Sequence, residues 1–198
     1  MRSNIFLTII ILLLANFAFG QNSLKEQLDS IYNNDQKYRN MLDSVFQKYG
    51  KESELYQDVW RKININDSIN LVKVTSILDK YGWLGDDLVG KKGNTALFLV
   101  IQHSDLKTQE KYKPIMENAV KNGQASASSF ALLTDRIEMG KGKPQIYGSQ
   151  VQGNRTNGYR LYPIFDEINV NIRRKEVGLQ PLEEYLKQWN IVYKSPEK

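Results

Sequence analysis

The sequence predicts a mainly α-helical protein, a single bundle-like domain with one β-hairpin in its C-terminal half. Apolar residues recur at steps of three and four over most of the chain, the spacing of one helix face. Only the stretch 145–164 changes to an extended pattern, with the turn signal Asn157–Gly158 inside it. The chain has 198 residues and is 41% hydrophobic, which suffices for the core of one domain.

The first twenty residues have the pattern of a signal peptide. Arg2 precedes an apolar run over 5–14, and Ala18 and Gly20 place small residues before a cleavage point at Gln21. The run is shorter than the roughly 20 residues that span a bilayer. We therefore expect an exported protein, periplasmic or extracellular, without a stable membrane anchor once the signal is cleaved. The alternative is an uncleaved anchor helix.

The first half of the mature chain is predicted to be four helices and a loop. Ser23 and Gly50 are suitable residues to begin and end the first helix. Asn64 to Asp67 are capping residues and predict a break before the next long helix. The last helix is apolar nearly all round, so we expect it at the centre of the fold. The predicted segments are helix 23–49, a short helix 55–60, helix 67–81, loop 82–93 and helix 94–101.

The second half begins with two further helices. Asp105 can cap one that reaches about Asn118, with a kink or restart at Pro114, and Ser126 or Ser128 can cap the next. The remaining predicted segments are strands 145–151 and 159–164, short helices 169–177 and 181–186, and a frayed tail 189–198. The helical domain is thus expected over 21–188.

Composition excludes several kinds of site. The chain has no cysteine and one histidine, so disulfides, thiolate zinc sites, a cysteine nucleophile and multi-histidine metal sites are excluded. We predict no metal and no cofactor. The net charge of +5 is mild, and the one dense basic run, Arg173–Lys175, is interpreted as a solvated helix face. We therefore expect no nucleic-acid partner.

Asp35 interrupts the apolar stripe of the first helix. A carboxylate there needs a partner, and Arg39 lies one helical turn further on the same face. The pair could form the wall of a ligand-binding cleft. The alternative is that Asn33 to Asp35 break the helix and that Asp35 caps its second half.

His103 follows Gln102 at the end of the predicted central helix. Histidine is the side chain that ordinarily titrates near neutral pH, which makes His103 the candidate general base. Asp105 or Asp135 would orient it. The alternative is a structural histidine with Asp105 as a helix cap. Gln102 is assigned to ligand binding.

Further candidates lie on the helix after Ser126 and in the hairpin. Asp135 and Arg136 border an apolar helix face, where a guanidinium can bind a carboxylate or phosphate, or form an internal ion pair. Gln145, Tyr147 and Gln150 are candidate ligand-binding residues. The alternative for these three is an ordinary edge hairpin.

The ordered set of polar strings resembles an uncharacterised bacterial family, a "domain of unknown function" group of exported, Bacteroidetes-type proteins. The resemblance spans about 23–186 and departs at Leu84, where proline is expected, and at Ser149, where threonine is expected. It implies a single helical domain in a bacterial envelope and no particular reaction. The strings are Asp35-Gln36 with Arg39, Asp67 with Asn70, Gly82-Trp83, Gln102-His103 with Asp105, Asp135-Arg136, Gln145 with Tyr147 to Gln150, and Arg173 or Arg174 before Gly178-Leu179.

Three functions stay open at this point. The first is a binding module for a small anionic or amide-bearing molecule or a peptide. The second is a hydrolase in which His103 activates water directly. The third is a structural or protein-interaction role. For the first two we expect a shared pocket formed by at least four of six side chains: Asp35, Arg39, His103, Asp135, Arg136 and Tyr147.

Overall fold

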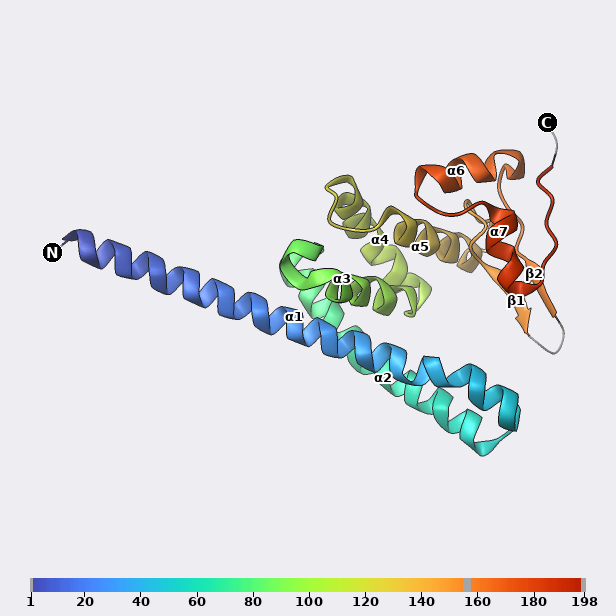
Figure 1. Ribbon diagram of the computed structural model, residues 1–198, viewed down its shortest axis with the longest axis horizontal. Coiled ribbons are helices and arrows are strands. Elements are labelled where there is room, and N and C mark those ends of the chain that lie inside the picture. The colour runs from blue at the N-terminus through green and yellow to red at the C-terminus, as the bar shows by residue number, and fades with distance from the viewer. Residues whose placement is uncertain (1, 155–157, 197–198) are drawn as a thin grey trace. The chain divides into compact units, whose positions relative to one another are not determined.

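A computed structural model describes the backbone of residues 2–154 and 158–196 and the side chains of 23–153 and 158–196. Seven α-helices and one small antiparallel hairpin make up these residues, which confirms the mainly α class (Figure 1). The chain divides into two compact units, residues 1–103 and 104–198, where the sequence predicts one domain over 21–188. Asn157 of the predicted turn lies outside the described residues.

Unit 1 consists of three helices, α1 (Arg2–Tyr49), α2 (Glu54–Tyr81) and α3 (Asp86–Gln102). The turn at Gly50, with φ of 75°, lets α2 return alongside α1 (Figure 1). Ser53 caps α2, since its Oγ accepts from Tyr56 N at 3.2 Å. Leu28 and Ile31 of α1 are buried.

The break predicted between 60 and 67 does not exist, because α2 is continuous from Glu54 to Tyr81. Its polar side chains bond the neighbouring helix instead of capping their own. Asn66 Nδ2 donates to Asn34 O at 3.0 Å, and Asp67 pairs with Arg39. A tertiary partner has replaced the local capping interaction that these residue types favour.

Helix α3 begins earlier than predicted, at Asp86 within the predicted loop, and is kinked at Gly90 with φ 70° and ψ 163°. Gly93 allows close packing, since a Cβ there would lie 3.2 Å from Leu28 Cβ. Ala96, Leu97 and Ile101 are fully buried, so this helix contributes to the core of unit 1.

Unit 2 begins with a helical hairpin, α4 (Leu106–Lys121) and α5 (Ala127–Gly140). The predicted caps are confirmed: Asp105 Oδ1 accepts from Thr108 N at 2.7 Å, and Ser126 Oγ accepts from Ser129 N at 3.2 Å. Helix α4 continues through Pro114, where a kink or restart was expected.

The strands are shorter than predicted, β1 (Val151–Asn154) and β2 (Gly158–Leu161), and pair antiparallel with Val151 opposite Leu161. Residues 145–150 form no strand apart from a single bridge between Gln145 and Ile164. Their backbone N–H groups bind an aspartate of α5 instead, so they cannot form a sheet ladder.

Short helices complete unit 2: η1 (Glu167–Asn169), α6 (Val170–Glu176), α7 (Leu182–Leu186) and η2 (Lys187–Trp189). A core cluster of Val170, Leu182 and Leu186 holds them together. Residues 189–193 of the predicted frayed tail contribute three apolar side chains that pack against this cluster, whereas 194–196 are exposed. The three side chains are Trp189, Ile191 and Tyr193.

The basic run on α6 is not a solvated face, contrary to the sequence interpretation. Arg174 is 1% exposed, stacks its guanidinium 4.9 Å from the ring centroid of Tyr185 and donates to Tyr147 O at 2.7 Å. Arg173 donates to Ile146 O at 2.9 Å. Both arginines donate hydrogen bonds to backbone carbonyls that are not paired with another strand.

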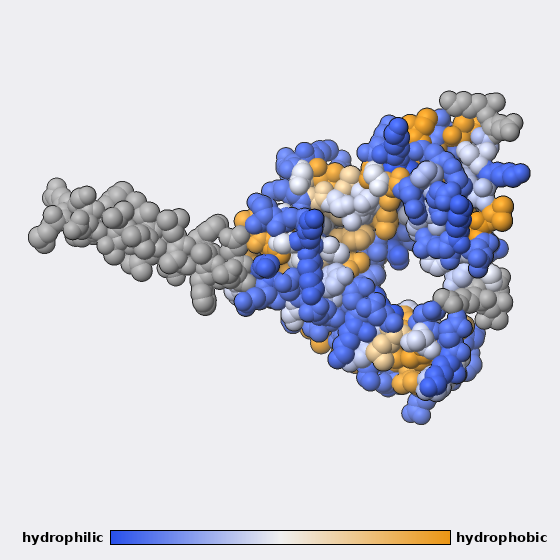
Figure 2. All heavy atoms as spheres, viewed as in Figure 1, coloured by the Kyte–Doolittle hydropathy of each residue, from blue (hydrophilic) through white to orange (hydrophobic). Residues whose placement is uncertain are grey.

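Polar residues cover most of the surface in view, and apolar residues emerge near the turn between α1 and α2 (Figure 2). Leu55 and Trp60 are among the exposed apolar side chains of α2. Among the residues that the structure describes, none of the helices has the length and apolar content of a membrane span.

Candidate functional site

Asp35 is the centre of the candidate site, which lies within unit 1. Helix α1 continues through it, as predicted, so the alternative of a break at Asn33 to Asp35 is wrong, and the Asp35 side chain is 0% exposed. Its carboxylate contacts three groups: Gln36 Nε2 donates to Oδ2 at 2.7 Å, Arg39 Nη1 lies 3.4 Å from Oδ1, and His103 Nδ1 lies 3.0 Å from Oδ1. The predicted pairing of Asp35 with Arg39 is confirmed.

His103 stands at the C-terminal end of α3, where its backbone N–H donates to Leu99 O at 2.9 Å. An ionised carboxylate only accepts hydrogen bonds, so the contact with Asp35 requires the proton on Nδ1. The neutral ring then has its lone pair on Nε2. The side chain of His103 is 18% exposed.

Arg39 joins Asp35 to Asp67 of α2. Its Nη1 and Nη2 donate to the two oxygens of Asp67 at 2.9 and 2.7 Å, and Nη1 also donates to the backbone O of Asp35 at 3.1 Å. The side chains of Arg39 and Asp67 are 19% and 25% exposed. A planar guanidinium held at both ends in this way is rigid. It fixes the position of Asp35 relative to α2.

The surroundings of Asp35 favour its ionised form. Burial alone would raise its pKa, but the hydrogen bond and charge of His103, the charge of Arg39 and the amide of Gln36 together lower the pKa below 3.8. Asp35 is therefore a carboxylate at neutral pH and can stabilise positive charge on the imidazole.

Asp35, Asp67 and His103 also offer oxygen and nitrogen atoms within 4.8 Å of one another, a spacing that suits a metal ion. Arg39 makes the fit poor. Its guanidinium occupies both oxygens of Asp67 and lies against Asp35 Oδ1, so a cation would have to displace a positive charge that is already bound. We derive no step through a metal.

Either Asp105 or Asp135 was predicted to orient His103. In the structure each of these two carboxylates has a different role. Asp105 is the N-cap of α4, and the backbone N–H of Thr108 lowers its pKa. The carboxylate that contacts His103 is Asp35.

Asp135, on α5 in unit 2, anchors the segment that precedes β1. Its Oδ1 accepts from Ile146 N and Tyr147 N at 2.7 and 2.9 Å, and its Oδ2 accepts from Ser149 N at 2.8 Å. Burial raises the pKa of Asp135, and the three N–H donors oppose this effect. Each carboxylate thus has partners in its own unit, and the pocket shared by Asp35 and Asp135 stays a prediction.

The two hairpin glutamines, predicted to bind ligand, bond each other. Gln145 Nε2 donates to Gln150 O and to Tyr162 O, both at 3.0 Å, and Gln145 Oε1 accepts from Gln150 N at 2.8 Å. The Gln150 amide donates to Ser149 Oγ at 3.0 Å. These contacts fix the chain around Asp135, and both side chains are buried.

The remaining predicted residues are partly or fully buried. Tyr147 lies in the anchored segment, and burial raises its pKa. Arg136 is half-buried on α5, and Gln102 is buried at the end of α3. In unit 1 the structure brings together Asp35, Arg39 and His103. In unit 2 it brings Asp135 to the backbone of Tyr147, and Gln145 to Gln150.

Sequence reasoning missed Asp67 and Gln36 as parts of the site. Asp67 was interpreted as a helix cap, and its pairing with Arg39 bridges 28 positions. The one available signal was the resemblance, whose strings include both residues.

The comparisons with known proteins give a family and no activity. A family model described as "Family of unknown function (DUF6624)" matches residues 23–195, which include every residue of this site. No curated protein and no solved structure matches the chain.

Proposed function

The chain belongs to the DUF6624 family, and from the geometry of its site we propose that Asp35 and His103 are the general acid–base centre of a hydrolase. The proposal rests mainly on one observation, the 3.0 Å contact between His103 Nδ1 and a fully buried carboxylate. This arrangement directs the lone pair of the neutral ring to Nε2 of a side chain that is partly exposed.

The reaction begins with a water molecule next to Nε2. Nε2 accepts a proton from the water as its oxygen attacks the substrate, and the imidazolium then gives that proton to the leaving group. Asp35 holds the ring in the required tautomer and stabilises the imidazolium. Arg39 keeps Asp35 in place through Asp67. Water is the nucleophile because the chain has no cysteine and no serine elbow motif.

The contacts support acid–base chemistry better than the ligand-binding role that the sequence suggested. Arg39 is held by two carboxylates, and Gln145 and Gln150 bond within their own segment. Groups already paired bind a ligand only by giving up these partners. A structural role, in which the Asp35–His103 contact only ties α1 to α3, is the competing account.

Activity assays on chromogenic esters, phosphomonoesters, phosphodiesters and glycosides test the proposal. We expect turnover of one class by the wild type and a loss of about 10²–10⁴-fold in His103→Ala. Asp35→Asn should also lose activity, whereas Asp58→Asn, which alters an exposed carboxylate on α2, should retain it. Circular dichroism verifies that each variant is folded. Full turnover by a folded His103→Ala protein would exclude the proposal.

We also propose that the chain is exported from a bacterial cell and processed before Gln21. The support is the charge, apolar run and small residues of 1–20. Mass spectrometry of protein recovered from a Gram-negative periplasm or culture medium should find Gln21 at the N-terminus. Recovery of the intact chain in the cytoplasmic fraction would contradict export.

A further inference from the structure

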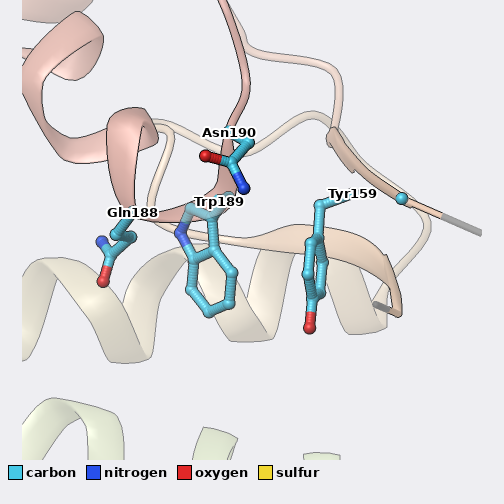
Figure 3. A pocket seen from close by; sticks show the side chains of 5 residues that line it. Tyr159, Gln188, Trp189 and Asn190 are labelled. Atoms are coloured by element: carbon cyan, nitrogen blue, oxygen red, sulfur yellow. The ribbon is translucent and has the colours of Figure 1, made fainter. Parts of the chain in front are cut away.

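A cavity of about 510 Å³ lies in unit 2, distinct from the Asp35–His103 site. Its lining comes from β2 and from the chain at the end of η2: Gly158, Tyr159, Gln188, Trp189 and Asn190 (Figure 3). The volume lies within the range of about 300–1,000 Å³ that is usual for small-molecule sites.

Two aromatic rings form one wall of this cavity. The centroids of Tyr159 and Trp189 lie 5.0 Å apart with the planes tilted by 56°, and both rings are partly exposed (Figure 3). Trp189 also packs against the cluster of Val170, Leu182 and Leu186, which anchors the ring. An anchored aromatic wall loses little side-chain entropy when a ligand binds.

Amide groups supply the polar part of the lining. Gln188 Nε2 donates to Tyr185 O at 2.9 Å, which orients its amide. Asn190 has a left-handed backbone with φ of 55° and ψ of 30°, a conformation that asparagine tolerates better than most residues. Its amide lies beside the two rings (Figure 3). None of the five lining residues is charged.

We propose that this cavity binds a neutral saccharide. A sugar ring has an apolar face of C–H groups, which stacks on aromatic rings, and hydroxyls around its edge, which both donate and accept hydrogen bonds. Asparagine and glutamine amides also both donate and accept, so they match hydroxyl groups. A charged ligand would have no opposite charge to meet among the lining residues that the structure describes. The inference is independent of the hydrolase proposal.

Titration of the full chain with cellobiose, maltose and N,N′-diacetylchitobiose tests this inference. Saturation-transfer NMR and calorimetry are the readouts. We expect one of the three to bind, and Tyr159→Ala and Gln188→Ala each to weaken binding by about tenfold. Trp60→Phe and Gln47→Ala alter an aromatic and a glutamine that are exposed in unit 1, so they should bind as the wild type does.

Trp189 packs against a core cluster, so alanine there would remove core packing. Trp189→Phe keeps an aromatic ring and is the variant to use at that position. Gln188 is exposed and can be replaced without loss of core packing, so a folded variant is available in any case. Failure of all three sugars to bind at about 10 mM, ten times the Kd of a millimolar site, would overturn the proposal. Equal binding by wild type and both Tyr159→Ala and Gln188→Ala would overturn it too.

Discussion

Asp35 Oδ1 lies 3.0 Å from His103 Nδ1, and 68 positions of chain separate the two residues. The contact joins the middle of α1 to the end of α3, and Arg39 extends it to Asp67 on α2. All three helices of unit 1 therefore meet at one buried carboxylate. Any change in the charge or hydrogen bonding of Asp35 should affect both the fold of this unit and the imidazole.

The first prediction concerns the stability of unit 1. Asp35→Asn removes the charge that balances Arg39 and one acceptor for the imidazole N–H, so we expect the free energy of unfolding to fall by about 1–3 kcal/mol. Urea denaturation at neutral pH measures it. Asp58→Asn is the matched control, because Asp58 pairs only with Arg61 and Lys62 at the surface among the described residues. A variant at position 35 as stable as the wild type would show that the buried contacts contribute nothing.

The second prediction is a pH dependence. The pKa of Asp35 is lowered on folding, so its ionised form stabilises the folded state above the unfolded pKa. This contribution is lost as pH falls through the folded pKa. The difference in unfolding free energy between wild type and Asp35→Asn should therefore be full above about pH 5 and shrink below about pH 4. A difference that grows as the pH falls below about 4 would contradict the lowered pKa of Asp35.

The third prediction concerns the bridge between Arg39 and Asp67. A double-mutant cycle with alanine at both positions should give a coupling free energy of about 0.5–3 kcal/mol, because two parallel hydrogen bonds join partly buried groups. The same cycle on Arg61 and Asp58, a single hydrogen bond in which the Arg61 side chain is 64% exposed, should show weaker coupling. Equal coupling in the two cycles would mean that burial does not strengthen the Arg39 pair.

The fourth prediction separates the cost of backbone strain from the cost of overpacking at Gly148 of unit 2. Gly148 and Gly142 have φ of 71° and 72°, but only at Gly148 would a Cβ meet neighbours, with Ile164 Cδ1 at 2.9 Å and Leu182 Cδ1 at 3.0 Å. Gly142→Ala should cost about 1–2 kcal/mol from backbone strain alone. Gly148→Ala should cost about 1–3 kcal/mol more through overpacking, measured by urea denaturation. Similar losses would show that the surrounding side chains move aside freely.

Local patterns in the sequence predicted much of the fold. Helix periodicity and the caps Asp105 and Ser126 depend on neighbours within a few residues, and both caps are found. The Asp35–Arg39 pair lies within one helical turn and was also predicted. Asn66 and Asp67 misled the prediction because the residue types that cap helices also form tertiary hydrogen bonds from within them.

Long-range partners could not be derived from local patterns. His103 has one acidic neighbour in sequence, Asp105, yet the chain reversals between α1 and α3 bring Asp35 to it. Asp135 looked like half of an ion pair, but it binds three backbone N–H groups, and no residue type in 146–149 signals that. The same contacts explain why the hairpin is shorter than predicted, because N–H groups that bind Asp135 cannot pair with another strand.

The tautomer of His103 tests the central claim most directly. The chain has one histidine, so long-range ¹H–¹⁵N NMR of the neutral ring gives a single pair of nitrogen signals. The account predicts a protonated Nδ1 and an unprotonated Nε2 in the wild type and in Asp105→Ala, and a loss of this preference in Asp35→Asn. A wild-type ring protonated at Nε2 would contradict the Asp35–His103 contact and, with it, the proposed general base.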